Sequence, residues 1–85
     1  FLTDALTIEA NGRIDAAVNA GKPFYLYFAQ YAVHAPFNSD PRFAPNYADS
    51  GHPAQWQAFA TLIEGMDKSL GNVIDHLYAI GQAQN

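Results

Sequence analysis

The stretch that decides the fold is Lys22–Phe37, with the sequence KPFYLYFAQYAVHAPF. Its first part, residues 24–29, is almost wholly aromatic or aliphatic and shows no alternation of apolar and polar side chains. A strand that is covered on both faces has this pattern, and a central parallel strand of an α/β sheet is the usual case. The pattern therefore predicts a strand at about residues 23–29 within an α/β sheet.

The residues that follow this strand have the chemistry of a site. Ligands of α/β sheets bind just beyond the carboxyl ends of the strands. Here that position holds Gln30, Tyr31 and His34, and Pro36 restricts the backbone after the histidine. An imidazole can change its charge near neutral pH and can donate a hydrogen bond. We therefore expect His34 to belong to a functional site.

Two helices and a long loop complete the predicted layout. Apolar residues recur at helical spacing over about residues 3–20 and again over about residues 54–80. Thr3 or Asp4 can cap the first helix, and glycines follow both helices at the positions that favour a left-handed backbone. Residues 30–53 are rich in proline, asparagine and aspartate, which predicts a loop. The expected fold class is α/β: a helix–strand–long loop–helix fragment of a layered domain, with residues 1–85 as a partial domain.

The composition limits the classes of partner that the chain can bind. The 85-residue chain has a formal net charge of −4, with 4 Lys and Arg against 8 Asp and Glu, and no cysteine. A surface that binds nucleic acid needs clustered cations, and a membrane span needs about 20 consecutive apolar residues. We therefore expect neither nucleic acid nor a membrane as a partner. The lack of cysteine excludes disulfides and thiolate zinc sites within these residues.

A single buried strand requires a neighbour for its backbone. Its N–H and C=O groups must find hydrogen-bond partners, and the sequence shows no second strand. We therefore expect the strand to pair either with the remainder of a longer chain or with a second copy.

Two blocks of the sequence resemble the sulfatases of the arylsulfatase type, within the alkaline-phosphatase superfamily. The first block is Lys22-Pro23-Phe24-Tyr25-Leu26-Tyr27 followed by His34-Ala35-Pro36. The second is Met66-Asp67-Lys68-Ser69-Leu70-Gly71-Asn72-Val73 within the second helix. The resemblance covers essentially the whole chain, and the two blocks in this order and separation are fairly specific to the family.

The resemblance implies a function and a role for one residue. It implies that the chain is an internal fragment of a calcium-dependent sulfuric-ester hydrolase, in which His34 contacts the sulfate ester of the substrate. It also implies that Asp67, which lies on or beside the apolar face of its helix, is structural rather than a metal ligand. The family resemblance favours a periplasmic or secreted protein. The sequence itself leaves the localisation and the identity of the ester unknown.

The cofactors that the resemblance implies are not encoded here. Sulfatases carry a Cys/Ser-x-Pro-x-Arg motif whose first residue becomes formylglycine, and a calcium site made of Asp and Asn or Gln side chains. The sequence holds no cysteine and no Ser-x-Pro-x-Arg. We therefore expect no cofactor in this chain, which alone should be inert, and assign calcium and formylglycine to the parent enzyme.

Two other functions stay open at this point: a phosphate- or phosphonate-ester hydrolase of the same superfamily, and a non-enzymatic module that pairs its strand with itself. Several residues have weaker cases. His52 is expected to be exposed at a helix start and His76 lies off the apolar stripe of the second helix, so neither is expected to have a role in a site. A loop metal site made of His34, Asp40, Asp49 and His52 matches no zinc spacing. Side chains that could either line a substrate cleft or anchor the loop are Tyr31, Phe37, Phe43 and Trp56.

Overall fold

The computed structural model of the chain describes residues 2–31, 33 and 38–84. Helix α1 spans Leu2–Asn19 and helix α2 spans Ala54–Ala79, with a short 3-10 helix, η1, at Ala44–Asn46 between them. The molecule is elongated, with principal extents of 50 × 21 × 16 Å. No described helix is both long enough and apolar enough to serve as a membrane span.

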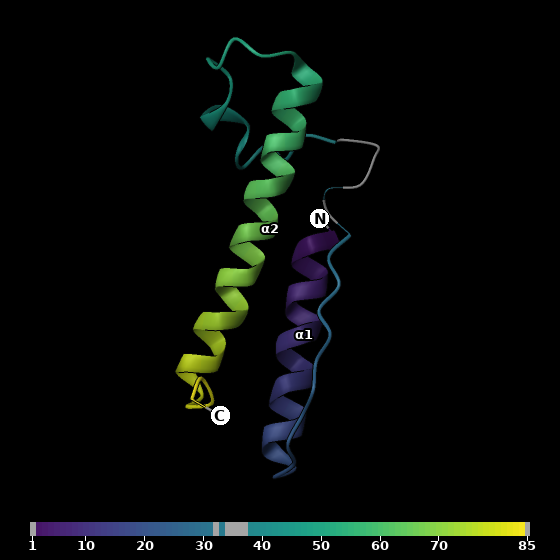
Figure 1. Ribbon diagram of the computed structural model, residues 1–85, viewed down its shortest axis with the longest axis vertical. Coiled ribbons are helices and arrows are strands. Elements are labelled where there is room, and N and C mark those ends of the chain that lie inside the picture. The colour runs from purple at the N-terminus through teal and green to yellow at the C-terminus, as the bar shows by residue number, and fades with distance from the viewer. Residues whose placement is uncertain (1, 32, 34–37, 85) are drawn as a thin grey trace.

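The two long helices run in the same direction (Figure 1). From the end of α1 the chain turns at Gly21 and returns along α1 as an extended segment, residues 23–31, before the loop and α2. Hydrogen bonds between the helices follow this parallel arrangement, because Thr7 pairs with Ser69 and Asp15 pairs with His76 further along both helices. The extended segment therefore runs antiparallel to α1.

The predicted α/β fold is wrong: the described residues contain two α-helices, one 3-10 helix and no strand. Residues 23–31 are extended, but they form no backbone hydrogen bond with another described residue. A strand is stable only when a neighbour satisfies its backbone groups. The described part of the chain contains no second strand that could pair with this segment, so no sheet forms there.

The extended segment is also covered on one side rather than on two. Phe28 packs against the helix core, whereas Tyr25 is 92 % and Tyr27 is 80 % exposed. Successive side chains of an extended chain point to opposite sides, so even-numbered residues face the helices and odd-numbered tyrosines face outward. A run that is apolar at every position does not reveal this difference.

A small core lies where α1 meets α2. Ala10, Ile14 and Val73 are buried there, and four partly buried side chains pack against them: Val18, Phe28, Leu77 and Ile80. Polar groups share the interface, since Thr7 and Ser69 are also buried. The helices are therefore joined by few apolar contacts together with side-chain hydrogen bonds.

Both helices end in the same way. Gly21 and Gly81 have φ values of +68° and +77°, which glycine adopts without strain. In each case the glycine N–H bonds the carbonyl three residues earlier, and the next N–H bonds the carbonyl five residues earlier, as in Lys22 N–H to Ala17 O at 3.0 Å. This is the Schellman motif, which satisfies carbonyls that a helix end leaves unpaired. At the other end, α1 starts at Leu2, so Thr3 and Asp4 lie within its first turn.

Replacing Ile14 by alanine tests the helix interface. Ile14 is 2 % exposed at the centre of the core, so Ile14→Ala should lower the free energy of unfolding by about 2–3 kcal/mol. The matched control is Ile8→Ala on the same helix, where the side chain is 74 % exposed and the expected change is below about 0.5 kcal/mol. Urea unfolding followed by circular dichroism measures both. Equal losses for the two variants would contradict the packing of α1 on α2.

Candidate functional site

The candidate site lies at the end of the molecule where the extended segment gives way to the loop (Figure 1). His34, Ala35, Pro36 and Phe37 lie outside the described residues. What the structure describes is the frame on both sides of them: Gln30 at the end of the extended segment, and the loop from Asn38 to Pro53. These two parts flank the segment that carries His34 in the sequence.

Asp40 fastens the start of the loop to α2. Its backbone N–H donates to Thr61 Oγ1 at 3.0 Å, and its side chain is only 5 % exposed. The carboxylate accepts three bonds from the Arg42 side chain: Nε donates to Oδ1 and Oδ2 at 3.0 and 3.2 Å, and Nη2 donates to Oδ2 at 2.6 Å. It also accepts the Arg42 backbone N–H at 2.9 Å, which closes an Asx turn. A buried carboxylate is therefore fully supplied with donors.

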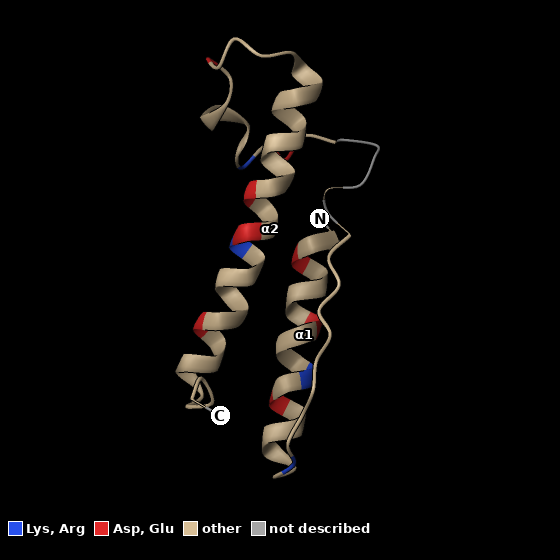
Figure 2. Cartoon of the chain, in the orientation of Figure 1, with Lys and Arg blue, Asp and Glu red and all other residues tan. Residues whose placement is uncertain are grey.

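Arg42 also connects the loop to α1. Its Nη2 lies 2.9 Å from Oδ2 of Asp4 in the first turn of α1. The guanidinium thus lies between two carboxylates. Figure 2 shows that acidic residues occur on both helices. Since Asp4 belongs to α1 and Asp40 is bonded to Thr61 of α2, one arginine ties the loop to both helices. No sequence pattern predicted this network, although Asp-Pro at residues 40–41 is a turn signal.

These contacts shift the ionisation of their members. The Arg42 side chain, and to a lesser degree its backbone N–H and charge, hold the pKa of Asp40 below its ordinary value, against the opposite effect of burial. The hydrogen bonds from Arg42 to Asp40 and Asp4 raise the pKa of Arg42 further above its usual range. Both groups stay charged at neutral pH, and the pair serves as an anchor rather than as an acid or base.

A second anchor holds the middle of the loop. Glu64 of α2 accepts the Tyr47 hydroxyl at 2.7 Å and both its oxygens lie near the Asn46 amide, at 3.1 and 3.0 Å. The bond to Glu64 raises the pKa of the Tyr47 hydroxyl, because it favours the protonated form. The loop between residues 38 and 53 is therefore fixed at two points along α2.

The aromatic side chains of the loop divide into two groups. Phe43 is half-buried beside Gly65, and the Arg42 and Lys68 cations lie over its ring at 5.1 and 5.8 Å from the centroid. Phe43 therefore anchors the loop. Trp56 and Tyr31 are 46 % and 67 % exposed. Of the four aromatic residues considered as cleft-lining or anchoring, Phe37 lies outside the described residues.

The other histidines have structural surroundings. His76 Nε2 lies 2.6 Å from Asp15 Oδ1 and links α2 to α1, while the His52 ring stacks on Trp56 with centroids 4.0 Å apart. Within the described ranges, no three His, Asp or Glu side chains form a group that could hold a metal ion. Asp67 is exposed rather than beside a buried face, because α2 turns Ser69 and Val73 toward α1.

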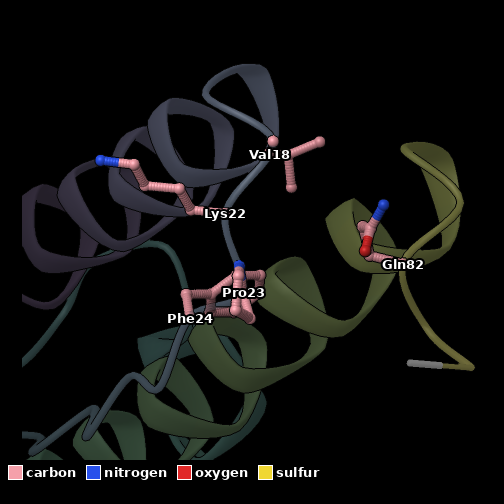
Figure 3. Close-up of a pocket in the computed structure, with 6 residues that line it drawn as sticks. Val18, Lys22, Pro23, Phe24 and Gln82 are labelled. Carbon is pink, nitrogen blue, oxygen red and sulfur yellow. The ribbon is translucent and has the colours of Figure 1, made fainter.

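A pocket of about 400 Å³ lies at the opposite end of the molecule. Figure 3 shows residues from the end of α1, the extended segment and the turn after α2 around it. Its lining residues are Val18, Gly21, Lys22, Pro23, Phe24 and Gln82. Lys22 is the single titratable group among them, and its side chain points away from Gln82 (Figure 3). The pocket therefore lacks a pair of groups for acid–base chemistry.

The contacts of Asp40 should make the free energy of unfolding depend on pH in the acid range. The pKa of Asp40 is lower in the folded protein than in the unfolded chain, so its contribution is full above the unfolded value, near 4. It is lost as the pH falls through the depressed folded value. The free energy of unfolding, measured by urea titration from pH 6 down to pH 2, should fall less steeply in Asp40→Asn than in the unmodified chain.

The control is Asp49→Asn, an exposed position in the same loop, whose curve should run parallel to that of the unmodified chain. Identical slopes for all three proteins would contradict the anchor.

Comparison with known families gives one match. The family model described as Sulfatase matches residues 2–85. No curated protein matches the chain. The match takes in both helices, the extended segment, the segment that contains His34 and the anchored loop. Because it covers nearly the whole sequence, the chain belongs to the Sulfatase family.

Proposed function

We propose that this chain is part of a sulfuric-ester hydrolase and that it contributes His34 to the active site. The observation that carries the proposal is the family match, which extends over residues 2–85 and so includes His34-Ala35-Pro36. The frame described above supports it, since the loop after this segment is bonded to both helices. A residue that acts on a substrate must be held in place by such surroundings.

The proposed role of His34 is to donate a hydrogen bond to a sulfate oxygen. Negative charge on the oxygens changes as the ester bond breaks, and a donor aimed at them stabilises the transition state more than the ground state. An imidazole serves in either its neutral or its protonated form, because each has an N–H. We infer that the substrate is a sulfate ester.

Calcium and formylglycine belong to the proposal only for a longer protein. The sequence contains no cysteine and no Ser-x-Pro-x-Arg, so it holds no residue that matches the family's nucleophile motif. The described residues likewise bring no acidic cluster together as a metal site. The part of the reaction that we assign to this chain is therefore the contact of His34 with the ester oxygen.

We also propose that the outward side of the extended segment is covered by the remainder of a longer sulfatase chain. Tyr25, Tyr27 and Tyr31 expose 92 %, 80 % and 67 % of their surface, and the adjoining backbone lacks partners among the described residues. Helix α2 exposes a second apolar stripe, made of Trp56, Ile63, Leu70 and Ile74. Contiguous apolar surface of this kind marks an interface. A second copy of this chain is the alternative occupant, which the experiment below distinguishes.

His34→Ala tests the active-site role. In the full-length protein, kcat for 4-nitrophenyl sulfate should fall by roughly 10²–10³-fold, the usual loss when one donor to a developing charge is removed. Thermal unfolding should change little, because the substitution is confined to the site segment. His52→Ala is the matched control, since His52 is exposed and stacks on Trp56. Unchanged kinetics in His34→Ala would sink the assignment.

Hydrogen exchange tests the covered surface. The backbone amides of residues 24–29 should exchange rapidly in the isolated 85-residue chain and become protected in the full-length protein, because exchange slows when amides are bonded. The amides of α2 are the internal reference in both samples. Protection that grows with the concentration of the isolated chain would instead identify a second copy as the occupant, and rapid exchange in both samples would contradict any partner.

A further inference from the structure

A chain of side-chain hydrogen bonds runs from the extended segment into the interface between the helices. Gln30 Nε2 donates to Ser69 Oγ at 3.0 Å. Ser69 Oγ lies 2.5 Å from Thr7 Oγ1, and the Thr7 hydroxyl donates to the carbonyl of Thr3 at 2.7 Å. Ser69 and Thr7 are only 3 % and 6 % exposed. The side chain of Gln30 is thus fixed to α2 directly and to α1 through one hydroxyl.

The direction of every bond in this chain is determined. A hydroxyl has one proton to donate, and that of Thr7 goes to the Thr3 carbonyl. Thr7 Oγ1 must therefore accept from Ser69, which uses the single proton of Ser69. Ser69 can then only accept from Gln30, and only the amide NH2 group can donate. The orientation of the Gln30 amide follows from the network rather than from its shape.

The oxygen at the other end of the same amide is buried and lacks a partner among the described residues. Gln30 Oε1 is inaccessible to solvent and has no hydrogen-bond partner among the described residues. A buried carbonyl oxygen without a donor costs free energy, whereas a methionine of similar length would fill the space at no such cost. The amide therefore contributes a defined position more than it contributes stability.

Within the described residues, the extended segment has few other attachments to the helices that could define its position. Phe28 packs against the core by apolar contact, which is not directional, and Tyr25 and Tyr27 point outward. Among the described hydrogen bonds, the bond from Gln30 to Ser69 is the one that joins the side chains of residues 23–31 to α2. It is made at the end of the segment that precedes His34.

We propose that Gln30 is a positioning residue for the sulfatase site: its bond to Ser69, oriented by Thr7, sets the place at which the chain leaves the helices and enters the segment with His34. This inference rests on the proposed function. It assigns a role to three residues, Gln30, Ser69 and Thr7, that need not touch the substrate. Their effect reaches the reaction through the position of His34, because a small displacement of a reacting group lowers the rate strongly.

The test uses variants at the two ends of the hydrogen-bond chain in the full-length protein. Gln30→Met keeps the length of the side chain and removes the bond, and Thr7→Val keeps the shape and removes the hydroxyl. With 4-nitrophenyl sulfate, both should lower kcat by about 10-fold or more while KM changes by less than about 2-fold. Amides at the end of the extended segment should exchange faster in both. Thr7→Ser retains the hydroxyl and should restore the kcat of the unmodified enzyme.

The outcomes separate this inference from the proposed function. If His34→Ala loses activity while Gln30→Met and Thr7→Val keep both kcat and amide protection, the positioning role is wrong and the function stands. If His34→Ala keeps full activity, the proposed function fails, and the positioning role falls with it. A Gln30→Met variant that does not fold, as judged by circular dichroism, leaves the decision to the Thr7 pair. Equal kcat in Thr7→Val and Thr7→Ser would then overturn the inference.

Discussion

The parallel packing of α1 on α2 is the constraint on which the rest of the structure depends. Two consecutive helices that point the same way need a connection that travels back the length of the first helix. Helix α1 has 18 residues, which corresponds to about 27 Å. An extended chain covers that distance in roughly eight residues, at about 3.3 Å each. Residues 23–30 supply this length, so topology requires an extended backbone here even though no neighbouring strand is present among the described residues.

The same arrangement places the loop next to the starts of both helices, where polar contacts hold it. Asp40 and Arg42 bond to α2 and α1, and Glu64 bonds to Tyr47 in the middle of the loop. Apolar packing alone is small in this chain, since the buried apolar cluster between the helices contains Ala10, Ile14 and Val73. Directional hydrogen bonds therefore determine how the loop is placed against the two helices.

The sequence allowed the helices to be located because two independent signals agreed. The apolar period marks their faces, and Gly21 and Gly81 follow their ends, where the structure shows the positive φ values of two Schellman motifs. The predicted strand was wrong because an uninterrupted apolar run does not show whether both sides of the segment are covered. In the structure Tyr25 and Tyr27 are exposed. Bonds such as Gln30 to Ser69 join residues far apart in the sequence, and no local pattern marks them. The family could be recognised because its motifs depend on residue identity and not on the fold assigned to them.

Apolar contacts hold the extended segment against the helices, whereas the hydrogen bond of Gln30 is directional, and this difference explains why a glutamine stands at the end of the segment. Side chains alternate along an extended chain, so a slip by one residue would turn Tyr25 and Tyr27 toward the helices and Phe28 toward solvent. Apolar contacts oppose such a slip weakly, because they are not directional and most side chains of the segment are aromatic or aliphatic. A hydrogen bond between Gln30 and a buried serine is specific to one register, since no residue adjacent to Gln30 has an amide side chain. Under the proposed function, this register sets where the segment with His34 begins, which gives a buried amide with no Oε1 partner among the described residues a use at the boundary of the proposed site.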